Sequence, residues 1–344
     1  MPTRRHFNFD PLSPVEQNHS VISAADERKA LLAEWLEQDT PFSGGSLEIA
    51  SADASFRRYF RIQSGGHNFV VMDAPPDLED SHPFVKIGEW MKSQNIHVPE
   101  IFAKDLTKGF MVLSDFGDFH FQDALEIQNR DSLYELAMEE IVRMQRNLLD
   151  AQNNLPRFDQ SWQKKELDIF RQWCLPNLSV QEYQKSTESL IKVTDLIPKA
   201  FMHRDFHCRN LLLCTENNLG IIDFQGAMFG PVTYDLVSLL RDCYVDNEPD
   251  WIDQRVLEFQ KNLQAAGLPY ANVSEDEFLM WFDLAGLQRH LKCVGIFHRL
   301  KIRDNKPEYL KDVPRVLRYC KEVLNRHPDL RDLDNLVGQA TILD

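Results

Sequence analysis

Long hydrophobic runs and paired cysteines are both missing from this chain of 344 residues. No apolar run approaches the ~18 residues that a membrane-spanning helix needs. Residues 1–20 contain two early arginines but no apolar segment after them, so we read no signal peptide there and expect a polar leader. The six cysteines show no CxxC spacing, which argues against zinc or disulfides and favours reduced thiols in a cytoplasmic protein.

Positive charge is also scarce. The chain has 38 Lys and Arg against 53 Asp and Glu, a formal net charge of −15. This balance opposes nonspecific binding to nucleic acid or to an anionic membrane. We therefore expect small-molecule chemistry without a nucleic-acid or membrane partner, and we take a monomer as the expected state.

The first third of the chain has the patterns of a small antiparallel sheet. Three strands are predicted within 46–76, with a tight turn at 64–66, and two shorter strands end near Leu113. A helix is predicted at about 83–94. Another is predicted over 23–38, opening with a capping box of Ser23 and Asp26. On one face it would present Leu31, Leu32, Trp35 and Leu36.

From about residue 119 the patterns become helical. Amphipathic helices are predicted over 130–150, 161–174, 233–245, 274–303 and 312–325, and a hairpin over 211–224 interrupts them. A small sheet-rich lobe followed by a larger helical lobe with an embedded hairpin is the organisation of a kinase. The fold class expected is α+β, a bilobal protein-kinase-like fold. We expect an N-terminal nucleotide-covering lobe over 21–116 and a helical lobe with the catalytic loop and substrate site over 117–344.

The segment "HRDFHCRN" at 203–210 carries the chemistry. Asp205 precedes Asn210 by five residues, the spacing H-x-D-x-x-x-x-N of a kinase catalytic loop. Asn210 enters one strand of the predicted hairpin and Asp223 leaves the other, so a symmetric hairpin would place them opposite each other. Oxygen ligands of this kind suit Mg²⁺. We predict that Asp205 orients or deprotonates an acceptor hydroxyl, and that Asn210 and Asp223 bind Mg²⁺ with ATP as co-substrate.

Two histidines belong to the same loop. His203 is expected to hydrogen-bond backbone within the loop. His207 either braces the loop or lies near the acceptor, and bracing is the interpretation we favour.

Two features of protein kinases are absent. The third strand has Met72 and Asp73 where a lysine for the α/β-phosphates is expected, and the first turn is not glycine-rich. Either the chain is a pseudokinase that binds nucleotide without turnover, or another cation replaces the lysine. By strand alternation, Arg57 and Arg61 share one face and Arg58 the other. Arginine suits phosphate, although these arginines could also be solvent-facing residues on a sheet edge. Because the catalytic loop and Asp223 are intact, we favour an active kinase.

The segments "HRDFHCRN" and "IIDFQGAMFGPVTYDLVSLLRD" resemble the aminoglycoside phosphotransferase and choline kinase superfamily. Further segments, among them "SADASFRRYFRI", "NIHVPEI", "LSDFGD" and "LQRHLKCVGIFHRLKIRDNKPEYL", narrow the resemblance to the bacterial anomeric sugar kinases of cell-wall recycling. The resemblance runs from about residue 27 to 325. It implies ATP- and Mg²⁺-dependent phosphorylation of N-acetylmuramate, N-acetylglucosamine or both at C1.

The resemblance also implies roles for residues outside the catalytic loop. Asp235 is expected to be a structural acid near the site. The residues expected to contact ATP are Ser55, Arg57 and Arg61 on the phosphates and the backbone of Val112, Leu113, Ser114 and Asp115 on the adenine. An aminoglycoside or choline is the alternative acceptor, and such cationic acceptors would call for clustered acids in the helical lobe.

A basic segment in the helical lobe is a further candidate site. Residues 289–303 contain five Lys or Arg and no acid. On a continuous helix, Arg289, Lys292, Arg299 and Arg303 fall within an arc of about 80°. This stripe is either a solvated face paired with acids of other helices or a substrate contact. The resemblance places it in the substrate lobe, so we expect Arg289, Lys292 and Arg299 to bind the lactyl carboxylate that distinguishes N-acetylmuramate.

Overall fold

The structure is a computed structural model, and it describes residues 14–340 except 44, 53–55 and 216–217. The chain divides into two compact units. The first contains the residues up to His82 together with Glu100–Asp115, and the second contains Pro83–Pro99 and the chain from Phe116 onward. Within the described ranges, no helix combines the length and the apolar character that crossing a membrane requires.

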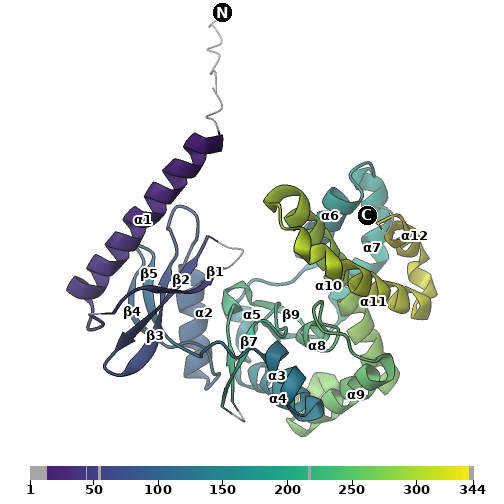
Figure 1. Cartoon of the computed structure of the whole chain (residues 1–344). Coiled ribbons are helices and arrows are strands. Elements are labelled where there is room, and N and C mark those ends of the chain that lie inside the picture. The colour runs from purple at the N-terminus through teal and green to yellow at the C-terminus, as the bar shows by residue number, and fades with distance from the viewer. Residues whose placement is uncertain (1–13, 44, 53–55, 216–217, 341–344) are drawn as a thin grey trace, which may run out of the picture. The chain divides into compact units, whose positions relative to one another are not determined.

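The first unit is built on a five-stranded antiparallel sheet with the strand order β1-β2-β3-β5-β4 (Figure 1). The strands are β1 (Glu48–Ala52), β2 (Arg58–Ser64), β3 (His67–Asp73), β4 (Ile101–Asp105) and β5 (Phe110–Ser114). Gly65 and Gly66 form the turn between β2 and β3 with φ values of 58° and 82°. Glycine adopts this left-handed backbone without steric penalty. The predicted strands and their tight turn are confirmed.

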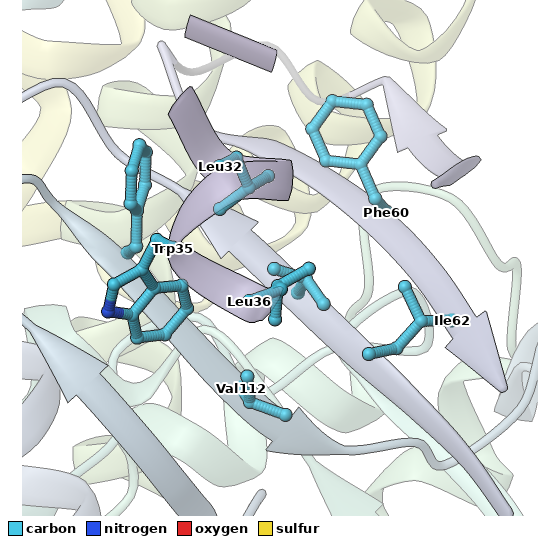
Figure 2. Close-up of a cluster of buried hydrophobic side chains, with 8 residues drawn as sticks. Leu32, Trp35, Leu36, Phe60, Ile62 and Val112 are labelled. Atoms are coloured by element: carbon cyan, nitrogen blue, oxygen red, sulfur yellow. The ribbon is translucent and has the colours of Figure 1, made fainter. Parts of the chain in front are cut away.

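Helix α1 (Pro14–Asp39) supplies the other half of the first core. Leu32, Trp35 and Leu36 pack against side chains of the sheet, which include Phe60, Ile62, Val71, Phe110 and Val112 (Figure 2). Leu31, predicted on the same face, is 51% exposed, so the sheet does not cover that edge of the face. Nor does the helix begin at Ser23: residues 14–20, expected in a polar leader, are already helical. A proline at the first helical position is favourable because its missing N–H would have no partner there.

The second unit is mostly helical. Its helices are α2 (His82–Ser93), α3 (Phe121–Ile127), α4 (Arg130–Asn147), α5 (Ala151–Asn154), α6 (Gln160–Cys174), α7 (Val180–Leu196), α8 (Tyr234–Leu240), α9 (Pro249–Ala265), α10 (Glu275–Asp304), α11 (Val313–Arg326) and α12 (Arg331–Ala340). Two antiparallel strand pairs accompany them: β6 (Lys199–Met202) with β9 (Met228–Pro231), and β7 (Leu211–Thr215) with β8 (Asn218–Ile221). The expected α+β class is therefore confirmed.

The segment 83–99 differs from the expected lobe boundaries. We expected it in the N-terminal lobe, but it groups with the second unit. The cause is apolar packing: the rings of Phe84 on α2 and Phe224 lie 4.9 Å apart, and Phe224 also packs beside Gly88. The backbone N–H of Ile221 also donates to the carbonyl of His97 at 2.9 Å, so the residues after α2 are bound to the end of β8.

Helix α10 is the longest element of the second unit and is buried along much of its length. Its first turn is capped by Ser274, whose hydroxyl accepts from the Glu277 N–H at 3.2 Å. At Gly295 the helix approaches α6 so closely that a Cβ there would lie 2.6 Å from the Phe170 nitrogen. No other residue type fits this spacing without movement of one helix, and the close approach brings side chains of α6 and α10 together.

Candidate active site

The β7–β8 hairpin brings Asn210 and Asp223 together. Its register pairs Leu211 with Ile221, and the Ile222 N–H donates to the Asn210 carbonyl at 3.1 Å. At this open end the Asn210 Nδ2 lies 3.4 Å from the Asp223 Oδ2. Asp223 is exposed and has a left-handed backbone with φ 65°. The predicted juxtaposition of the two side chains is present in the structure.

Asp205 lies beside this pair in the same loop. The Asn210 Nδ2 donates to the Asp205 carbonyl oxygen at 2.9 Å, which ties the start of the loop to its end. The Asp205 side chain is 37% exposed, and its Oδ1 is 3.9 Å from the Lys292 ammonium. Burial by itself would raise the Asp205 pKa, but Lys292 and Arg204 outweigh it and hold the pKa below its ordinary value.

The backbone entering the loop is held by a buried acid. Arg204 has φ 81°, a left-handed conformation that is unfavourable for a side chain of its size. The Asp235 carboxylate accepts the backbone N–H groups of His203 (2.7 Å) and Arg204 (2.8 Å) and so stabilises this conformation. Burial raises the Asp235 pKa to about 7, although the two N–H groups act in the opposite direction. The contacts of Asp235 suit the structural role expected for it.

A second buried acid, Asp242, escaped the sequence analysis. Its carboxylate accepts the N–H of Cys208 and the N–H of Tyr244, both at 2.9 Å. It therefore holds the middle of the catalytic loop as Asp235 holds its start. The signal was present in the segment "DLVSLLRD", where the two acids are seven residues apart, or about two helical turns.

The two histidines of the loop differ in exposure: His203 is buried and His207 is half-buried. The His203 Nε2 lies 3.1 Å from the carbonyl of Ile222, at the end of the hairpin, and burial lowers the His203 pKa to about 4. The ring is therefore neutral at physiological pH. His207 packs edge-on against Tyr244, with ring centroids 5.4 Å apart, and burial lowers its pKa too. These surroundings favour a bracing role for both rings.

A buried cluster of charges lies behind the loop. Glu166 on α6 accepts from the Arg204 Nε (3.0 Å) and the Gln288 Nε2 (3.1 Å). Its Oε1 lies 3.9 Å from the Lys292 ammonium, the same distance that separates Lys292 from Asp205. Lys292, expected to contact substrate, thus lies between two carboxylates of its own chain. Sequence reasoning missed Glu166, because nothing in the pattern of α6 distinguishes it from a solvated acid.

The other residues of the basic stripe have different surroundings. Arg289 is buried, and its Nη1 lies 3.5 Å from the Cys243 sulfur. Arg299 is half-buried, whereas Arg303 is exposed and pairs with Asp304 at 2.7 Å. The stripe is therefore not one solvated face. Among the residues that the structure describes, no ion pair within 4.0 Å links Arg289 or Arg299 to a carboxylate.

Arg58 and Arg61 lie on opposite faces of β2, as strand alternation predicts, and Arg57 comes just before the strand. Arg58 faces β3 and forms an ion pair with buried Asp73, which also binds Arg28. The Arg61 Nε pairs with Asp115 at 2.5 Å, and Arg57 pairs with Glu79 at 3.3 Å. All three arginines thus have carboxylate partners in their own unit and are not simply solvated.

The remaining nucleotide candidates lie on or beside β5. Val112 and Leu113 are buried, and the Ser114 N–H donates to the Glu100 carbonyl at 2.9 Å. Asp115 follows the strand and holds Arg61. Ser55 lies outside the described residues.

A five-stranded sheet unit and a helical unit with this loop and hairpin define the class of phosphotransferases. The chain belongs to the phosphotransferase enzyme family, whose model matches residues 46–270. It is similar to the N-acetylmuramate/N-acetylglucosamine kinase of Pseudomonas putida, with 41% identity over 303 residues that cover 86% of this chain and 88% of that protein. The enzyme of the same name from Neisseria meningitidis is 36% identical over 320 residues, which cover 89% of this chain and 94% of that protein. The resemblance found in the sequence is confirmed.

Solved structures agree on the fold. An ethanolamine kinase from Plasmodium vivax matches with a TM-score of 0.60 at 11% identity, covering 80% of this chain and 82% of that one. The aminoglycoside phosphotransferase APH(2'')-Ib in its ADP-bound form gives a TM-score of 0.59 at 14% identity, over 86% and 98%. At these identities the likeness establishes the kinase-like fold and not the acceptor.

Proposed function

We propose that this protein is an ATP- and Mg²⁺-dependent kinase that phosphorylates the anomeric hydroxyl of N-acetylmuramate, N-acetylglucosamine or both. The sugar 1-phosphate would serve peptidoglycan recycling in the cytoplasm, and the enzyme would act as a monomer. The observation that carries the proposal is the position of Asp205, whose carboxylate faces Lys292 while its carbonyl binds Asn210 beside Asp223. The names of the relatives supply the acceptor.

In this proposal Asp205 acts on the acceptor. Its carboxylate takes the proton of the C1 hydroxyl as the sugar oxygen bonds to the γ-phosphorus and the bond from that phosphorus to ADP breaks. The low pKa of Asp205 means that the group is ionised and ready to accept a hydrogen bond at neutral pH. An anomeric hydroxyl is more acidic than an ordinary alcohol, so a carboxylate of low basicity is sufficient to orient and deprotonate it.

Asn210 and Asp223 fit a magnesium ion by the chemistry of their side-chain oxygen atoms. The Asn210 Nδ2 is directed at the Asp205 carbonyl, and its Oδ1 has no hydrogen bond within the described part of the chain. Across the same residues there is no cluster of three or more His, Cys, Asp or Glu suited to a metal. Two protein oxygens are enough for Mg²⁺, which takes its other ligands from phosphates and water. When bound, the ion would neutralise charge on the transferred phosphate.

For the nucleotide, we propose that Ser55, Arg57 and Arg61 contact the phosphates and that the backbone of 112–115 contacts the adenine. The ion pairs of Arg57 and Arg61 with Glu79 and Asp115 hold these side chains in place before nucleotide binds. The planar arginine fork suits phosphate oxygens, which supports this assignment.

The test is a screen for ADP release with N-acetylmuramate, N-acetylglucosamine, choline and aminoglycosides as acceptors. Turnover with the amino sugars alone is expected. The product is then analysed by NMR, where the phosphorus should couple to the C1 proton. Coupling to the C6 protons would contradict the anomeric assignment, and ATP binding without turnover on any acceptor would support the pseudokinase alternative.

A further inference from the structure

Lys292 is a buried cation between carboxylates of two different segments. Its side chain is almost fully enclosed, and its ammonium is 3.9 Å from Glu166 on α6 and 3.9 Å from Asp205 in the catalytic loop. Buried charges persist in proteins when they are paired. Burial alone would lower the Lys292 pKa, but Glu166, Tyr234 and Asp205 keep it above its ordinary value, so the side chain is charged.

Glu166 has a second cationic partner, whereas Asp205 has only Lys292 within ion-pair distance among the described residues. Glu166 already accepts hydrogen bonds from Arg204 and Gln288, at 3.0 and 3.1 Å, and so has a cationic partner without Lys292. Two carboxylates, Glu166 and Asp205, face two cations, Arg204 and Lys292. Arg204 is hydrogen-bonded to Glu166 and, in the described part of the chain, forms no ion pair within 4.0 Å with Asp205, so Lys292 is the nearer of the two cations to Asp205.

The contact between Lys292 and Asp205 involves one oxygen of the Asp205 carboxylate. Lys292 is 3.9 Å from Oδ1, and the Asp205 side chain is 37% exposed, so Lys292 does not enclose the carboxylate. Across the part of the chain that the structure describes, Lys292 is the one residue that forms an ion pair with Asp205. The position of Lys292 depends in turn on the close packing of α10 and α6 at Gly295, one turn further along.

We propose that Lys292 is a positioning residue that holds one oxygen of Asp205 so that the other meets the acceptor hydroxyl. This proposal rests on the proposed function, since it requires that Asp205 acts on the acceptor. It assigns to Lys292 a role in turnover with both sugars, different from the carboxylate contact expected for Arg289 and Arg299.

The first experiment compares Lys292→Met with Lys301→Met, an exposed lysine of the same helix. Lys292→Met should lower kcat by about 100-fold, the lower end of what a positioned general base contributes. The KM values for ATP and for both sugars should stay within about threefold, because the lysine touches neither substrate. Lys301→Met should match the wild-type enzyme. Lys292→Arg should recover at least a tenth of the wild-type kcat, about 1.4 kcal/mol of barrier or less.

A double-mutant cycle with Asp205→Asn decides whether Lys292 acts through Asp205. If it does, Lys292→Met should change the small residual kcat of Asp205→Asn, measured at high enzyme concentration, by less than about twofold. Equal effects in both backgrounds would overturn the proposal, and so would a rise in KM confined to N-acetylmuramate. If Lys292→Met does not fold, as judged by circular dichroism, Lys292→Gln takes its place with the same expected outcomes. Full activity of Asp205→Asn alone would refute the role of Asp205 in the proposed function, a distinct result.

Discussion

Asp205 and Asp223 are carboxylates of one loop and hairpin, but their surroundings differ. Asp205 faces the buried Lys292, whereas Asp223 is exposed and accepts from the Gln225 side chain. A carboxylate held by a cation is suited to act on a hydroxyl, and an exposed one beside Asn210 is suited to a hydrated cation.

These surroundings predict that substitution of Asp205 affects turnover and that substitution of Asp223 affects Mg·ATP binding. Asp205→Asn should remove turnover and leave binding of Mg·ATP nearly unchanged, because the acid acts on the acceptor. Asp223→Asn should weaken Mg·ATP binding itself. Steady-state kinetics and isothermal titration calorimetry measure the two effects. If Asp205→Asn retained more than a tenth of the wild-type kcat, equal to about 1.4 kcal/mol of barrier, its assignment as the base would be wrong.

The arginines in and beside β2 should differ in their effects on stability and on ATP kinetics. Arg58 compensates the buried carboxylate of Asp73, so Arg58→Ala should destabilise the protein by about 1–3 kcal/mol, a range typical of a lost hydrogen bond to a charged group. Its KM for ATP should change little. Arg61→Ala and Arg57→Ala should instead raise the KM for ATP and lower kcat. Thermal unfolding and ATP titrations distinguish these results, and unchanged ATP kinetics in both variants would leave the arginines with structural roles alone.

Arg289 and Arg299 predict a difference between the two sugars. N-acetylmuramate carries a lactyl carboxylate that N-acetylglucosamine lacks, and neither arginine pairs with a carboxylate within 4.0 Å among the described residues. Arg289→Ala or Arg299→Ala should therefore raise the KM for N-acetylmuramate selectively. The loss in binding free energy should be about 1.5–3 kcal/mol, the contribution of a charge-assisted hydrogen bond. Arg303→Ala, at the exposed end of the same stripe, is the control. Equal losses for both sugars would show that these arginines support the fold.

At the scale of elements, the hairpin was predictable and the packing of helices was not. The segment predicted as a turn is centred midway between Asn210 and Asp223 in the sequence, so the pattern alone predicted that these two residues lie together. Glu166 could not be recognised, because its burial depends on α10, more than a hundred residues further along the chain. The exposure of Leu31 was not predicted for a related reason: helical periodicity defines a face of the helix but not how much of that face a sheet covers. Asp242 was readable from its spacing to Asp235 and was overlooked.

The contact between α6 and α10 predicts the effect of one methyl group. Gly295→Ala would place a Cβ 2.6 Å from the Phe170 backbone nitrogen, so one helix must move. We expect a loss of about 1–3 kcal/mol in the free energy of unfolding, typical of overpacking, together with a lower kcat as Lys292 shifts. Gly338→Ala is the control, because a Cβ on that helical glycine meets nothing within 4 Å and alanine favours a helix. Equal stability of the two variants would contradict this account.

At the scale of the whole molecule, each unit has its own apolar core. In the first, Leu32, Trp35 and Leu36 pack on the sheet (Figure 2). In the second, Phe158, Met202, Met228 and Tyr234 form a separate cluster. The sequence predicted the order of sheet and helices, because strand and helix periods differ. It did not predict that 83–99 would leave the first unit, because that choice depends on a distant partner, Phe224.

Separate cores predict separate responses to heat. Leu32→Ala should destabilise the first unit by about 2–5 kcal/mol, the usual effect of truncating a buried leucine. The transition of the second unit should not move. Differential scanning calorimetry of the full chain measures both. A single transition that shifts as a whole would show instead that the two units unfold cooperatively.

The departure of 83–99 from the first unit also has a consequence for synthesis on the ribosome. The buried face of α2, which includes Phe84, Ile87 and Met91, acquires its partner Phe224 only after 140 further residues, from 84 to 224, have been made. At about 5–20 residues per second this delay lasts roughly 7–28 seconds. Throughout that interval the nascent chain carries an apolar helix without its final partner. A ribosome-bound chaperone therefore has a long interval in which to bind this segment.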